Sequence, residues 1–189
     1  MVSRIEVGFK KGIRDALGEK VRKRIIDNFS LPVRNVATIE VYTIAGDLTT
    51  EELNKAAAGP LSDPVIQKFS INKPLAAGFD WLIEVGFRPG VTDNVGRTAR
   101  EAIEYITGRP FAAGEGVYTS VQYLLSGALS RTDVERIARD LLCNTLIQRY
   151  IILDRAEFAT AGGVAVVVPK VTGETRAQVR EIDLNVSDD

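Results

Sequence analysis

An internal duplication restricts the fold of this chain more than any other feature of its sequence. The segment Glu6 to Ile25 aligns without a gap to Glu84 to Ile103. Nine of these twenty positions are identical, whereas ordinary residue usage would give about one or two by chance. A repeat of roughly 80 residues is too long for one unit of a solenoid, so it indicates a duplicated small domain.

A second match lies nearer the end of each copy. Leu48 to Phe69 aligns with Leu129 to Tyr150, so that VIQKF corresponds to LIQRY. The spacing between equivalent positions is larger here than in the first match, which implies three inserted residues in the second copy. We place them around the segment RPFAAGEG. We therefore predict a first module over residues 1–73, a second over residues 79–158 and a C-terminal tail or linker over residues 159–189.

Both copies show the same order of predicted elements. Ile5, Val7 and Phe9 alternate with polar or small residues, which predicts an opening strand, and the second copy repeats this pattern. An amphipathic helix, a β-rich stretch, a second helix and a closing strand follow. This order is β-α-β-α-β, or βαββαβ if the middle stretch bends into two strands. In the tail we predict two strands around the KVTGE turn, the first including residues 164–168.

The element order predicts an α+β fold of two tandem βαβαβ modules of the ferredoxin-like kind. Apolar faces in such modules are buried by antiparallel sheets that carry their helices on one face. An exposed sheet edge and an apolar face favour association of the two modules. Because the linker INKPLAAG is short, we expect them to pack as a pseudo-two-fold pair within one chain.

An aspartate precedes the first predicted helix of each copy, at Asp15 and Asp93. We expect these residues to be N-caps, because a carboxylate accepts from the free N–H groups there and suits the positive end of the helix dipole. Gly18 and Gly96 follow three residues later, which predicts a close approach of another backbone segment to the first turn. We assign these four residues a structural role.

Several other residues allow a functional and a structural interpretation. Glycines 8, 12, 86 and 90 are compatible with a phosphate-binding loop, but we favour turn geometry because the Asp caps already use the same N–H donors. The basic stretch of residues 10–24 is typical of a solvated helix face. We expect Glu6 and Glu84 to lie on the exposed face of a strand, and Cys143 to be a buried small apolar residue.

The composition excludes several kinds of chemistry. There is no histidine, so neither a Ser-His-Asp triad nor an imidazole zinc site can form within the chain. A GxxxxGK[ST] phosphate loop is also absent from the sequence. The net charge of −1 provides no general attraction for nucleic acid, and no apolar run reaches the length of a membrane span. We therefore expect no cofactor or metal, no nucleic-acid or membrane partner, and a cytoplasmic location. The composition leaves catalysis by carboxylates or lysines possible, but we assign no catalytic residue.

Two segments carry a resemblance to a known family. Phe87 to Gly96 reads FRPGVTDNVG, and Leu141 to Tyr150 reads LLCNTLIQRY. The first resembles the opening VxLKxGVxDPxGxAV of PurS, the accessory subunit of formylglycinamidine ribonucleotide synthase, and the second resembles its closing LLANxxIExY. In the first copy, residues 9–18 carry the opening motif with Ile13 for the valine, and residues 61–69 are a looser match to the closing segment. The resemblance covers residues 3–73 and 81–155. The Asp-Pro of the family is Asp-Ala and Asp-Asn here.

The resemblance implies a non-catalytic part in phosphoribosylformylglycinamidine synthase of purine biosynthesis. In that family a synthetase of the PurL type uses ATP to activate an amide, and a glutaminase of the PurQ type releases ammonia through its own cysteine. PurS joins these two partners, as subunits or domains, so that ammonia passes between them. Large single-chain synthases carry an N-terminal region that resembles a PurS pair, and we expect that this chain is either such a front piece or a separate subunit.

A second resemblance belongs to another class of protein. ACT-type regulatory domains begin with a strand, a Pro-Gly-Val turn and a helix, and they occur in pairs that bind a small molecule such as an amino acid. Arg88 to Val91 reads RPGV and resembles that turn. The helix here is delayed by the Asp-x-x-Gly step, and only one copy has the proline, so the ACT-like pair is the alternative hypothesis.

Overall fold

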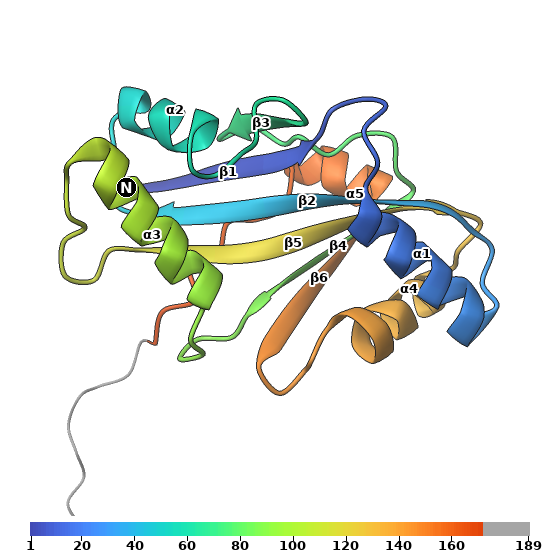
Figure 1. Cartoon of the computed structure of the whole chain (residues 1–189). Coiled ribbons are helices and arrows are strands. Elements are labelled where there is room, and N and C mark those ends of the chain that lie inside the picture. Colours follow the sequence, from blue (N-terminus) through green and yellow to red (C-terminus); the bar gives the residue numbers. More distant parts are fainter. Residues whose placement is uncertain (172–189) are drawn as a thin grey trace, which may run out of the picture.

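The computed structural model describes residues 1–171, and its helices and strands alternate in the same order in both copies (Figure 1). The first copy consists of β1 (Val2–Phe9), α1 (Ala16–Phe29), β2 (Val33–Ala45), α2 (Thr50–Ala58) and β3 (Gln67–Ile71). The second consists of β4 (Trp81–Phe87), α3 (Asn94–Thr107), β5 (Gly116–Gly127), α4 (Arg131–Ile137), the π-helical turn η1 (Ala138–Leu142), β6 (Gln148–Asp154) and α5 (Arg155–Ala161). The middle stretch of each copy is thus one continuous strand.

Within residues 1–171 the strands all belong to one antiparallel sheet, because β2 and β5 pair along their whole lengths. The strand order is β3-β1-β2-β5-β4-β6. Thr38 lies opposite Tyr123, and Glu40 lies opposite Val121. Extending the second sequence alignment back from Leu48 and Leu129 makes Glu40 and Val121 equivalent residues of the two copies. Because these equivalent residues lie opposite each other, the two copies meet at the same point of their middle strands. The α+β class and the antiparallel sheet agree with the sequence-based prediction.

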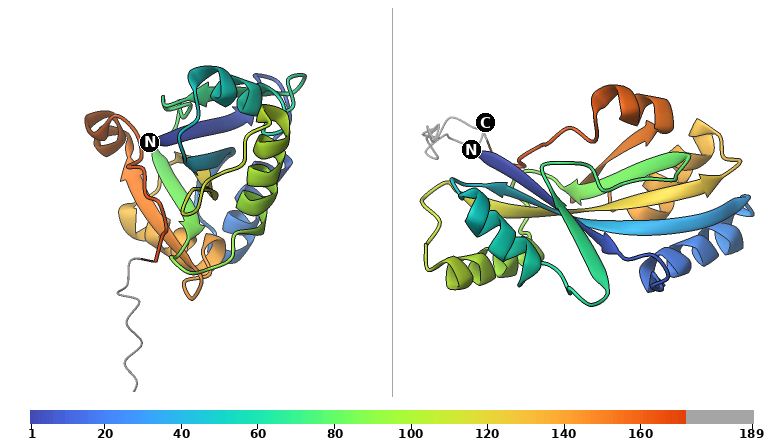
Figure 2. Two further views of the ribbon diagram at one scale, coloured as in Figure 1. Left: turned by 90° about the vertical axis from the view of Figure 1, so that its left-hand side faces the viewer. Right: turned by 90° about the horizontal axis from the view of Figure 1, so that it is seen from above.

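Two apolar cores lie on one face of the sheet, and each is built from both copies. Figure 2 shows α1, α2 and α3 on this side. In one core, α2 of the first copy and α3 of the second copy pack against Ile5 and Ile44. In the other core, Val21 and Ile25 of α1 pack with α4 against Ile83 and Leu125. The first helix of each copy therefore shares a core with the second helix of the other copy.

The opposite face of the sheet is covered in part by the start and the end of the second copy and by the tail. Figure 2 shows α5 on this side. Phe79, which directly follows the linker, packs with Phe158 of α5 and Val164 against Val41 and its apolar neighbours on the sheet. The Phe79 and Phe158 rings meet edge to face, with their centroids 5.2 Å apart. Helices were expected on one face only, so α5 is a departure from that prediction.

The C-terminal tail also differs from the sequence-based prediction. Residues 155–161 form α5, whose N-cap Asp154 and third residue Glu157 make a capping box. Residues 164–168 contain no strand, so the first predicted strand of the tail is wrong. Instead, Val164 turns its side chain into the core on the second face of the sheet. The second predicted strand lies outside the described residues.

Candidate functional site

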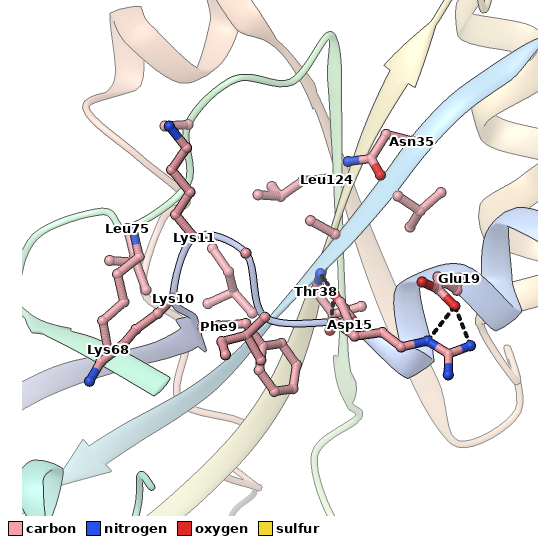
Figure 3. A pocket seen from close by; sticks show the side chains of 18 residues that line it. Phe9, Lys10, Lys11, Asp15, Glu19, Asn35, Thr38, Lys68, Leu75 and Leu124 are labelled. Carbon is pink, nitrogen blue, oxygen red and sulfur yellow. Dashed lines mark hydrogen bonds and ion pairs between the residues drawn. The ribbon is translucent and has the colours of Figure 1, made fainter. Parts of the chain in front are cut away.

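The turn between β1 and α1 borders a cavity of about 480 Å³ (Figure 3). Its walls come from the end of β1, the turn itself, the start of α1, β2, β3, the linker between the copies, and β5. The lining includes residues 8–15, Glu19, residues 35–39, Lys68, Leu75, Ala77 and Leu124. The cavity therefore lies where both copies and the linker meet.

Asp15 fixes the geometry of this turn. Its Oδ1 accepts a hydrogen bond from the Gly18 N–H at 2.7 Å, which makes it the N-cap of α1. Its Oδ2 accepts from the backbone N–H of Thr38 at 2.6 Å and from the Thr38 hydroxyl at 2.9 Å. Asp15 thus begins the helix and also ties it to the central strand β2. A side chain at Gly18 would collide with the carbonyl oxygen of Val36, so the predicted close approach is present.

The second copy repeats this arrangement. Asp93 is the N-cap of α3, and its Oδ1 accepts from the Gly96 N–H at 2.7 Å. Its Oδ2 accepts from the N–H of Thr119 at 2.6 Å and from the Thr119 hydroxyl at 2.9 Å. A side chain at Gly96 would collide with the carbonyl oxygen of Val117. All four residues with a predicted structural role therefore lie at the start of a helix, two in each copy.

The backbone conformation of the turn explains why glycines flank it. Gly12 has φ of +87° and Gly90 has φ of +84°, in the left-handed region that other residues rarely adopt. The Gly18 N–H at the start of α1 points to Asp15, and the equivalent group in the second copy points to Asp93. These bonds favour turn geometry over a phosphate loop, because a capping carboxylate already uses the donor that a phosphate would need.

Lysines border the cavity above an apolar floor. Lys10 Nζ donates to the carbonyl oxygens of Pro64 and Val65, at 2.5 and 3.2 Å. Lys11 and Lys68 are exposed, and within residues 1–171 neither makes an ion pair. The floor is formed by apolar side chains of both copies and of the linker, namely Ile39, Leu75 and Leu124.

The carboxylates at the cavity are already engaged. Glu19 makes a salt bridge of 2.6 Å with Arg14, and this hydrogen bond lowers the pKa of Glu19 below its ordinary value. Both oxygens of Asp15 accept hydrogen bonds from the protein. The charged side chains at the cavity that make neither a hydrogen bond nor an ion pair within residues 1–171, Lys11 and Lys68, are therefore positive.

The equivalent position in the second copy is almost closed. There the cavity measures about 20 Å³. Tyr118 stands in the place of Ala37, and Val167 and Pro169 of the tail border it. The two copies thus share the turn and its hydrogen bonds, but within residues 1–171 the space beside them is open in the first copy and almost closed in the second.

A buried cluster of charges lies on the second face of the sheet and joins the two copies. Arg4 donates from Nε to Glu6 at 2.8 Å, and from both terminal nitrogens to Glu84, at 3.2 and 2.6 Å. Gln122 Nε2 donates to Glu6 at 3.3 Å and to Glu84 at 3.0 Å. Burial acts to lower the pKa of Arg4, but its hydrogen bonds with Glu84 and Glu6 raise that pKa above its ordinary value.

Glu6 and Glu84 were expected on an exposed strand face, and this prediction is wrong. Their side chains are only 3% and 11% exposed. The linker covers Glu6, whose Oε2 accepts from the Leu75 N–H at 2.7 Å. Strand alternation placed both residues on the correct face, but it does not show that later segments of the chain cover that face.

Other predicted features have plain positions in the fold. Cys143 is 8% exposed at the end of η1, and burial raises the pKa of its thiol. Within residues 1–171, no group of acidic side chains and cysteine is placed to hold a metal ion. The helices in that part of the chain are too short or too polar to cross a membrane. Much of the basic stretch of residues 10–24 is exposed, as expected for a solvated helix face.

Sequence reasoning missed the threonines that hold the aspartates. Thr38 and Thr119 are counterparts when the second alignment is extended toward the N-terminus, so that alignment carried a signal for them. Ala37 and Tyr118 are counterparts in the same alignment, and they differ greatly in the size of their side chains.

The fold is thus a duplicated α+β sheet, and the candidate site is an open cavity beside a strand-to-helix turn that an aspartate caps. Comparison of the chain with protein-family models found no match, and neither did comparison with curated proteins.

Proposed function

We propose that the chain is a non-catalytic accessory part of phosphoribosylformylglycinamidine synthase in purine biosynthesis, built from two tandem PurS-like modules. The observation that supports this proposal is the role of the PurS-like motif in both copies. Its aspartate caps a helix and binds the central strand, and its second glycine lets the helix approach that strand. The motif residues thus build a scaffold, as a part that joins other proteins requires.

Matched exposed apolar side chains are candidate contacts for the partners. Val65 and Leu146 are counterparts in the second alignment and are 77% and 86% exposed. Each lies in the turn before the last strand of its copy. Exposed apolar residues at equivalent places provide two similar surfaces. We assign one of these surfaces to the synthetase and the other to the glutaminase.

Reconstitution with a PurL-type synthetase and a PurQ-type glutaminase tests the proposal. We expect the chain to co-purify with both partners and to raise the glutamine-dependent rate of synthesis. Synthesis from added ammonia should not need it, because ammonia then reaches the synthetase from solution. Leu146→Glu should weaken co-purification, whereas Tyr105→Glu, which changes an equally exposed side chain without an apolar counterpart, should not. A glutamine-dependent rate that is the same with and without the chain would contradict the proposal.

The isolated chain should show neither glutaminase nor ATPase activity. The only cysteine is buried, and its thiol pKa is raised, so little thiolate forms near neutral pH. Glutamate release and phosphate release from the pure chain measure these activities, with Cys143→Ser as the matched variant. Glutamate release that disappears in Cys143→Ser would show that the chain is itself a glutaminase.

The ACT-like alternative receives little support from the geometry. The turn that resembles the ACT motif, Arg88 to Val91, belongs to the copy whose cavity measures about 20 Å³. The larger cavity lies beside the turn without proline. A thermal shift caused by free amino acids, without co-purification of a synthetase, would favour this alternative.

A further inference from the structure

We propose that the cavity beside the β1–α1 turn binds a small organic anion that contains a planar ring. The ring lies over Ala37, and the anionic group lies at Lys11 and Lys68. This site is independent of the proposed role in the synthase, because either can hold without the other.

The duplication supplies an internal comparison for this cavity. Most of the side chains around the small space in the second copy are counterparts of those around the large one. The shared pairs are Gly8/Gly86, Phe9/Phe87, Ala37/Tyr118, Thr38/Thr119, Ile39/Ser120, Lys68/Arg149 and Leu124/Thr43. A cover is also present in both, formed by the linker at Leu75 in the first copy and by the tail at Val167 in the second. The difference between Tyr118 and Ala37 therefore leaves the first site without an aromatic ring, and Ile39 and Leu124 in place of Ser120 and Thr43 make that site more apolar.

The open space accordingly suits a planar ring. Ile39, Leu75 and Leu124 offer it apolar contacts. In the second copy the hydroxyl end of Tyr118 reaches toward Gly116, where a Cβ would lie 3.5 Å from the hydroxyl oxygen. The counterpart of Gly116 is Asn35, which lines the open cavity. The Asn35 amide can thus exchange a hydrogen bond with a polar group at the far edge of the ring.

The charges at the cavity select an anion. Lys10, Lys11, Arg14 and Lys68 line it, against two carboxylates, Asp15 and Glu19. The capping bonds of Asp15 and the salt bridge of Glu19 occupy these carboxylates. Lys11 and Lys68 remain to bind a ligand, and Figure 3 shows Lys68 and Asn35 at opposite ends of the cavity. A local excess of positive charge on a chain of net charge −1 attracts small anions.

Volume and charge together define the class of ligand. The space of about 480 Å³ falls in the range of ligand pockets, which is about 300–1,000 Å³. Aromatic carboxylates and nucleoside monophosphates both combine a planar ring with an anionic group. They share the chemistry that the cavity recognises, and direct binding measurements distinguish them.

Calorimetric titration of the full chain with four probes tests the site. These are 4-hydroxybenzoate, phenyl phosphate, adenosine monophosphate and inorganic phosphate. We expect at least one ring-containing probe to bind with a stoichiometry of one, and inorganic phosphate to bind at least about tenfold more weakly. Absence of binding by all three ring-containing probes at millimolar concentration would overturn the proposal. Equal binding of inorganic phosphate would also overturn it, because the ring would then contribute nothing.

Two matched substitutions use the duplication as a control. Ala37→Tyr places in the first copy the ring that the second copy already holds, and we expect it to weaken binding at least about tenfold while the chain stays folded. Tyr118→Ala opens the second site, between Arg149 and the tail, and should raise the stoichiometry toward two. A folded Ala37→Tyr variant that binds as tightly as the parent chain would refute the site.

Charge reversal decides the question if Ala37→Tyr does not fold. Lys11 and Lys68 are exposed, so Lys11→Glu and Lys68→Glu should leave the melting temperature nearly unchanged. We expect each to weaken the ring-containing probe at least about tenfold, and Lys20→Glu, on the exposed part of α1, to have little effect. Unchanged binding in both Lys11→Glu and Lys68→Glu would place the ligand elsewhere.

Discussion

Asp15 and Asp93 each use their two carboxylate oxygens for two different structural contacts. One oxygen caps a helix, and the other binds the N–H and hydroxyl of a threonine in the central strand. We therefore expect Asp93→Ala to lower the free energy of unfolding by about 2 kcal/mol, because loss of a cap costs about 0.5–2 kcal/mol and an unsatisfied N–H adds to it. Urea unfolding measures the change.

A matched control for this prediction lies on α1. Asp27→Ala removes an exposed carboxylate from the helix surface, and it should have little effect on unfolding. Thr119→Val, which removes only the hydroxyl, should fall between the two variants. If Asp93→Ala kept full stability but no longer bound a partner, Asp93 would have an interface role in place of the capping role.

The buried charge cluster links elements of both copies on the second face of the sheet. Arg4 on β1 binds Glu84 on β4, and Gln122 on β5 binds both carboxylates. We expect Arg4→Met to lower the free energy of unfolding by about 3–5 kcal/mol, because it leaves two buried carboxylates without their cation. The same substitution at Arg14, whose pair with Glu19 is exposed, should change stability little. Equal, small effects of the two substitutions would show that water reaches the carboxylates of the cluster.

The elements that the sequence predicts well are those with a regular apolar period. The alternation in β1 and β4, the helix faces and the Asp caps all depend on neighbours within a few residues. The three-residue insertion was also placed correctly, since the loop of residues 108–115 carries it and supplies Phe111 to the core under α2 and α3. By contrast, α5 was not predicted. It directly follows the apolar strand β6, and its sequence signal is the capping box that begins at Asp154.

What the sequence did not predict depends on contacts between distant segments. Glu6 becomes buried because the linker residue Leu75 crosses above it, and no local pattern reports such a crossing. The open cavity lies beside Ala37, whereas the almost closed one lies beside its counterpart Tyr118 and the tail residues Val167 and Pro169. The resulting asymmetry is visible only when both copies are seen folded together.

At the scale of the whole molecule, neither copy can close its own cores. The first helix of each copy packs with the second helix of the other, and β5 is paired along its length with β2. A fragment of residues 79–171 would expose that edge and leave α3 without α2. Exposed strand edges and apolar faces drive association. We therefore expect this fragment to form a dimer, in which β5 pairs with its own copy and Val121 faces Val121.

Light scattering over a range of concentrations measures this association, and the full chain should remain monomeric under the same conditions. Val121→Pro in the fragment provides the sharper test. It removes an N–H at the centre of β5, which is the strand that must form the new interface. The dimer should then dissociate into an unfolded or poorly folded chain, because the shared cores cannot form in one copy alone. A fragment that is a stable, folded monomer would instead show that each copy is an independent domain, and that the shared cores of the full chain are dispensable.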